Sequence, residues 1–102
     1  MNMSIVWVFN GGRNPFPSGV FRQRQHAEAW IRQHRLTGTL TAYPLDIGVY
    51  HWAIEQGHFK LKTDKHSTPA FIESFSSAAQ EHYHYENGER PGETTNRTID
   101  AE

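Results

Sequence analysis

The apolar residues of this chain come in short runs, and glycine, proline or asparagine closes most of them. The first run, residues 5–9, ends at Asn10-Gly11-Gly12, and a second group of turn residues follows at 14–19. This pattern divides the 102 residues into brief strands and helices. No apolar run approaches the ~18 residues that a membrane span requires. We therefore expect one small domain without a membrane segment.

The local patterns predict four strands and three helices. The strands are predicted from β-branched, aromatic or alternating residues: 4–9, 19–21, 39–43 and 81–86. The helices are predicted from apolar residues at helical spacing: 23–35, 47–56 and 69–75. The simplest architecture is an α+β fold, with a small, mainly antiparallel sheet of about four strands and two to three helices packed on one face. The first strand is expected to be central and buried on both faces.

Turn and capping residues predict where the helices begin and end. The first helix has one core-facing stripe of four residues: Ala27, Trp30, Ile31 and His34. No capping side chain precedes this helix, and Gly38 suits the left-handed position after it. Asp46 is predicted as the N-cap of the second helix, and Thr68 as that of the third, with Pro69 at the first helical position. The polar segment 62–67 is expected to be a mobile loop.

Residues 1–88 are predicted to form a single compact domain, and 89–102 a disordered polar tail. Asn87-Gly88 stops the last strand, and Ile99 is the one large apolar residue beyond it. A segment with so few apolar side chains cannot bury enough surface to offset the entropy of ordering. The domain is therefore expected to end near Gly88.

Composition excludes several classes of function. The chain has no cysteine, which excludes disulfides, thiolate metal sites and cysteine nucleophiles. Its net charge is −1 and its basic residues are only mildly clustered, so nucleic acid is not an expected partner. The N-terminal residues do not have the basic and apolar regions of a signal peptide, and a cytoplasmic protein is expected.

The alternating segment 81–86 contains the strongest candidate for a functional site. Three potential metal ligands share one side of a strand there: His82, His84 and Glu86. Two imidazoles and a carboxylate suit a divalent transition metal such as zinc, with a fourth ligand from His51 or His58. The competing interpretation is a polar sheet face that binds no cofactor, with Tyr83 and Tyr85 packed on the core side. Both interpretations predict the same strand, and a one-residue bulge in it would reverse the two faces and turn the histidines inward.

Four residues are candidates for a protein interface: Arg13, Phe16, His51 and Trp52. The first two lie in the loop between the first two strands, which is longer than a tight hairpin needs. Trp52 falls about 70° off the apolar stripe of the second helix. Tryptophan in such a position is either an interface anchor or part of the core.

Eight motifs occur in order along the chain: VWVFNG (6–11), FPSGVF (16–21), AEAWI (27–31), LTGTLT (36–41), YPLDIGVY (43–50), WAIE (52–55), FSS (75–77) and EHYHYENG (81–88). As a set, they resemble a family of small, mostly bacterial proteins classed as a domain of unknown function. Arg22-Gln23 stands where that family has serine or threonine before the first helix, consistent with the weak helix start. The resemblance implies a compact stand-alone domain and implies no activity.

The leading functional interpretation is a non-enzymatic protein-interaction module, of which an immunity protein or antitoxin is one form. Small size, aromatic surface candidates and the lack of a complete catalytic set favour it. The alternative is a metal-binding protein or metal-dependent enzyme that uses His82, His84 and Glu86. The sequence specifies neither the partner nor the oligomeric state.

Overall fold

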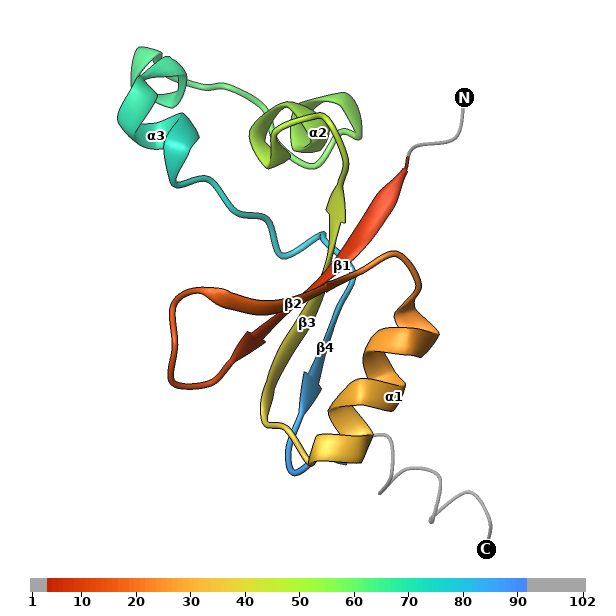
Figure 1. Cartoon of the computed structure of the whole chain (residues 1–102). Helices are drawn as coiled ribbons and strands as arrows, with labels where there is room; N and C mark the ends of the chain where they lie inside the picture. Colours follow the sequence, from red (N-terminus) through yellow and green to blue (C-terminus); the bar gives the residue numbers. More distant parts are fainter. Residues whose placement is uncertain (1–3, 92–102) are drawn as a thin grey trace, which may run out of the picture.

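The computed structural model describes residues 4–91, which form a four-stranded antiparallel sheet and three α-helices (Figure 1). The strands, in spatial order, are β2 (Pro17–Phe21), β1 (Ile5–Gly11), β3 (Gly38–Pro44) and β4 (His82–Tyr85). The helices are α1 (Arg24–His34), α2 (Val49–Glu55) and α3 (Pro69–Glu73), and a 3-10 helix, η1 (Asp64–Ser67), precedes α3. The predicted α+β class and the antiparallel sheet are confirmed.

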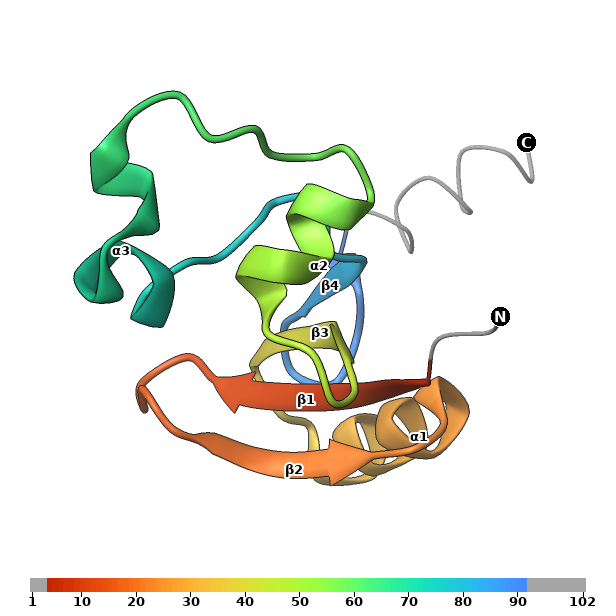
Figure 2. The same ribbon diagram turned by 90° about the horizontal axis from the view of Figure 1, so that it is seen from above.

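The three helices occupy different places around the sheet. Helix α1 lies across one face, whereas α2 and α3 lie beyond the end of the sheet where β3 leaves it at Pro44 (Figures 1 and 2). The face away from α1, here called the outer face, is the more exposed one. On it Val6 and Val8 of β1 are only half-buried, and Val20 of β2 is exposed. The expectation that β1 is buried on both faces is therefore wrong for this side.

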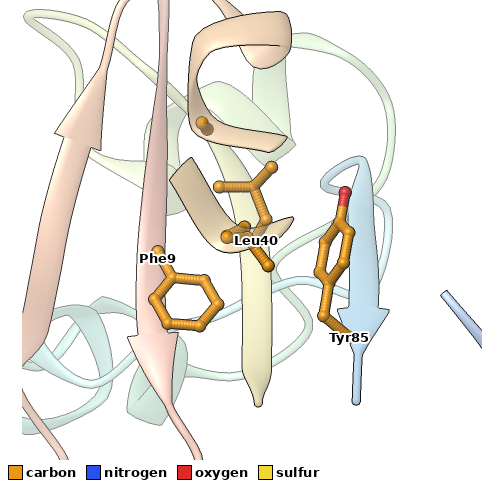
Figure 3. Packing of buried hydrophobic residues seen from close by; sticks show 5 residues of the cluster. Phe9, Leu40 and Tyr85 are labelled. Atoms are coloured by element: carbon orange, nitrogen blue, oxygen red, sulfur yellow. The ribbon is translucent and has the colours of Figure 1, made fainter. Parts of the chain in front are cut away.

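The core lies between α1 and the inner face of the sheet. Phe9, Leu40 and Tyr85 come from three neighbouring strands and point toward the helix (Figure 3). Ala27 and Ile31 of α1 are fully buried against them, as the predicted stripe requires. Trp30 and His34, the other members of that stripe, are half-buried and exposed. Helix α1 therefore contributes only two of the four predicted stripe residues to the fully buried core.

A second aromatic cluster holds α2 and α3 together. Its members meet ring to ring: Tyr50, Phe59, His66, Phe71 and Phe75. The Tyr50 hydroxyl donates to the His66 carbonyl at 2.7 Å, and the Lys62 amide donates to His66 Nδ1 at 3.0 Å. The segment 62–67, predicted as a mobile loop, contains the 3-10 helix η1. His66 of η1 contacts Tyr50 of α2 and belongs to the aromatic cluster.

Two of the predicted helix boundaries are wrong. Helix α1 ends at His34, and Arg35, not Gly38, adopts the left-handed conformation after it, with φ 54°. Gly38 instead opens β3 opposite Gly11. Asp46 is also left-handed, with φ 66°, and Gly48 is the N-cap of α2. The Thr68 N-cap of α3 is confirmed, since its Oγ1 accepts from the Phe71 amide at 3.3 Å.

The predicted stop of the last strand is also confirmed. Asn87 and Gly88 both adopt left-handed conformations directly after β4. The Gly88 amide donates to the Leu36 carbonyl at 2.8 Å, which seats this turn against the end of α1. Glu89 pairs with Glu86 beyond the turn, so main-chain contacts continue past the predicted boundary at Gly88. Most of the predicted tail, residues 92–102, lies outside the described residues.

Candidate functional site

The most exposed apolar side chains of the sheet belong to the β1–β2 hairpin. Phe16 in its loop is 73% exposed, and Val20 on β2 is 64% exposed. Arg13 is exposed in the same loop. These three residues are here called the hairpin surface. Two of them, Arg13 and Phe16, are among the predicted interface candidates, and the third escaped prediction because a strand valine is usually buried.

The loop that carries Phe16 is held in one conformation by short polar contacts. Asn14 Oδ1 accepts from the Phe16 amide at 3.0 Å, and Asn10 Nδ2 donates to the Pro15 carbonyl at 3.2 Å. Proline on both sides of Phe16 restricts the backbone further, because the ring fixes φ. The aromatic side chain is therefore presented to solvent from a fixed backbone.

An open hollow of about 410 Å³ lies beside this loop. Its lining residues come from the hairpin and from β3: Val8, Asn10, Pro15, Pro17 and Tyr43. Val8, which lines the hollow, pairs with the exposed Val20 across the two strands. The hairpin surface thus combines a projecting aromatic side chain with an adjoining apolar depression.

The other two interface candidates lie in a different place, on α2. Trp52 is half-buried, its ring centre lies 5.4 Å from that of His58, and it lines a hollow of about 180 Å³ with Gln80. His51 is exposed and its ring packs edge-on against Tyr50. The structure therefore divides the four predicted interface residues between the hairpin and α2.

His82 and His84 lie side by side, exposed on the outer face of β4. Their ring centres are 5.4 Å apart, with an angle of 85° between the ring planes. Within residues 4–91, no group of three or more histidine, cysteine, aspartate or glutamate side chains is placed to hold a metal ion. Accordingly, neither Glu86 nor the predicted fourth ligand, His51 or His58, joins the pair in such a group.

A network of charged and aromatic side chains joins α1 to β4 on the inner face. Glu28 Oε2 accepts from the Tyr85 hydroxyl at 2.6 Å and lies 3.7 Å from Arg24 Nε and 3.8 Å from Arg90 Nη1. Both guanidinium groups stack on the Tyr83 ring, at 4.8 and 4.1 Å from its centre. One interpretation of the sequence placed Tyr83 and Tyr85 on the core side, as the structure has them, but the pattern gave no sign of these charged partners.

The network changes the acidity of both tyrosines. Burial, followed by the hydrogen bond to Glu28, raises the pKa of Tyr85 above its ordinary value of 10.0. A hydrogen bond to Glu81, followed by burial, raises the pKa of Tyr83. Both phenols therefore stay protonated above the pH at which a tyrosine ordinarily ionises, and they donate to the carboxylates of Glu81 and Glu28.

The stability of the domain is expected to fall above pH ~10, the pKa of a tyrosine in an unfolded chain. The folded chain keeps its tyrosine protons to higher pH than the unfolded chain does. The stabilisation is therefore complete below that pH and declines as the pH rises toward the folded-state pKa. For buried Tyr85 the slope is about 1.4 kcal/mol per pH unit.

Urea unfolding at pH 9, 10 and 11 measures this slope, and Tyr85→Phe is the matched variant because it keeps the ring and removes the ionising hydroxyl. The variant should lose less stability than the wild type over this range. Equal slopes in the two proteins would contradict the assignment to Tyr85.

The fold and these surfaces define a small α+β domain whose sheet is covered by a helix on one face and carries exposed apolar and histidine side chains on the other. The chain belongs to DUF7710, a family described as a domain of unknown function, and the match spans residues 6–91. The predicted resemblance to a domain of unknown function is thereby confirmed. No curated protein and no solved structure matches the chain. In the described part of the chain, no helix combines the length and apolar character needed to cross a membrane.

Proposed function

We propose that this protein is a non-enzymatic protein-interaction domain that binds its partner through the hairpin surface, Arg13, Phe16 and Val20. The observation that carries the proposal is Phe16, whose side chain is 73% exposed although its backbone is fixed on both sides. Aromatic anchors contribute strongly to protein interfaces, and a fixed backbone lowers the entropy lost on binding.

The chemistry of the hairpin surface indicates the kind of partner. A partner that buries Phe16 needs an apolar pocket for its ring. The same partner can make further apolar contacts with Val20 and the adjoining hollow on the outer face. Arg13 at the edge favours an acidic group beside that pocket. An immunity protein or antitoxin is the special case in which the partner is a toxin.

Side chains, and not main-chain pairing, are expected to make this contact. The edge of β2 begins with Pro17, and the pairing with β1 shifts so that Ser18 has no opposite residue. Proline and an irregular register both prevent another strand from adding to an edge. The partner therefore docks on the outer face and loop instead of extending the sheet at β2.

Photo-crosslinking tests the proposal. A benzophenone amino acid replaces Phe16 in the full chain, and the same substitution at Leu61 is the control, since Leu61 is 45% exposed away from the hairpin. In lysate of the native host, position 16 should give one adduct that excess wild-type chain suppresses. An adduct of twice the chain mass would identify self-association, and adducts equal at both positions would contradict the proposal.

Once the partner is identified, Phe16→Ser should weaken its affinity about tenfold or more, because burying a phenylalanine contributes roughly 1.5–3 kcal/mol. The thermal midpoint of the free domain should stay nearly unchanged, since the side chain is mostly in solvent. Calorimetric titration measures the affinity, with Leu61→Ser as the matched control. Equal affinity for Phe16→Ser and wild type would rule out the hairpin as the contact.

A further inference from the structure

The histidine pair of β4 lies on the outer face at the opposite edge of the sheet from β2, so it is independent of the hairpin surface. Two imidazoles that bind one tetrahedral metal ion through nitrogens at about 2.0–2.1 Å have ring centres about 5 Å apart. The ring centres of His82 and His84 are 5.4 Å apart. The separation in the structure is thus close to that of two ligands on one ion.

The hydrogen bonds of the two rings leave the other nitrogens available. His82 Nδ1 donates to the Gln80 carbonyl at 2.7 Å, which fixes the neutral ring with its lone pair on Nε2. His84 Nδ1 lies 3.2 Å from Thr39 Oγ1 on the neighbouring strand. Histidine ligands of metals characteristically have their second ring nitrogen hydrogen-bonded in this way.

The sheet also limits how far the two rings can move. Each histidine pairs with a threonine of β3, His82 with Thr41 and His84 with Thr39, so both backbones belong to the antiparallel ladder. Residues two apart on a strand share a face, which keeps both imidazoles on the same side. Two exposed ligands on a fixed strand lose little freedom when a metal ion binds.

We propose that His82 and His84 form a two-histidine site for a borderline divalent metal ion of the Zn²⁺, Ni²⁺ or Cu²⁺ class. Imidazole nitrogen suits these ions, whereas Mg²⁺ and Ca²⁺ prefer oxygen ligands. The chain supplies two ligands, and water or a ligand from another molecule occupies the remaining positions. The site binds a metal at the protein surface and is not the closed four-ligand type of a structural zinc.

Calorimetric titration of the full chain, without a histidine tag, with ZnCl₂ tests the proposal. One equivalent should bind, and either His82→Asn or His84→Asn should weaken binding at least tenfold. His51→Asn is the matched control, because His51 is also an exposed histidine with an aromatic neighbour, and it should bind as the wild type does. Far-ultraviolet circular dichroism confirms that each variant is folded.

Two further measurements test the arrangement of the ligands. Cu²⁺ bound to the wild type should show two nitrogen ligands by electron paramagnetic resonance, and one in each single histidine variant. Thr39→Val, which keeps the shape and removes the hydroxyl at His84 Nδ1, should weaken Zn²⁺ binding about tenfold. Three results would overturn the proposal: no binding to the wild type, binding that survives loss of both histidines, or an effect of only one of them.

Discussion

Leu40→Ala is expected to lower the free energy of unfolding by about 2–5 kcal/mol. Leu40 is fully buried on β3 and packs between Phe9 of β1 and the α1 side chains (Figure 3). Shortening its isobutyl side chain to a methyl group leaves a cavity. The other core members come from three separate elements and cannot all move to fill it. A domain of this size has a total stability of roughly 5–15 kcal/mol, so the loss is a large share.

Urea unfolding followed by circular dichroism measures the effect of Leu40→Ala. The matched control is Leu61→Ala, the same change at a residue that is 45% exposed, and it should alter the stability by about 0.5 kcal/mol or less. A loss below about 1 kcal/mol for Leu40→Ala would show that the core lies elsewhere.

Gly38→Ala is expected to destabilise the domain by about 3 kcal/mol, the upper end of what overpacking costs. A β-carbon at position 38 would lie 2.1 Å from the Asn10 carbonyl oxygen, 2.9 Å from Gly11 Cα and 2.8 Å from the Phe9 ring. Two of these are backbone atoms of β1, so no side-chain movement relieves the contact. The added methyl group can be accommodated only if β1 and β3, the two central strands, separate at this end.

Gly12→Ala is the control for Gly38→Ala. A β-carbon at position 12 would meet no atom within 4 Å. Its effect should be near zero, because no backbone or side-chain atom has to move. Thermal unfolding of both variants compares them directly. If Gly38→Ala has the midpoint of Gly12→Ala, the close approach of β1 and β3 is not part of the fold.

Short-range patterns in the sequence predicted much of the fold. The alternation in residues 81–86 predicted β4 and put Tyr83 and Tyr85 together on one side of it, and Thr68-Pro69 located the start of α3. The same reasoning failed at Gly38 and Asp46. Gly38 looks like a helix stop in isolation, but its place is set by Gly11, 27 residues earlier, which pairs with it across β1 and β3. Pairing over that distance leaves no local signal.

The candidate sites also divide into those with a local signal in the sequence and those formed by residues far apart in it. Phe16 and the histidine pair were found because each depends on a local feature, a proline-flanked loop and a strand alternation. The network around Glu28 was missed because its contacts join residues far apart in the sequence. The sequence separation is 57 for Glu28 and Tyr85 and 59 for Arg24 and Tyr83. Glu28 is also indistinguishable, by spacing alone, from any solvated glutamate on a helix.

The position of β4 has a consequence for how the chain is made. Of the four strands in the described part of the chain, β4 is the last to leave the ribosome, and it completes the edge of the sheet beside β3. A nascent chain that ends before residue 82 has β3 as an unpaired edge, and Tyr85 does not yet flank Leu40. Exposed edges and apolar surface of this kind are where nascent chains associate or recruit chaperones. We therefore expect the nascent chain to be most prone to aggregation just before β4 emerges.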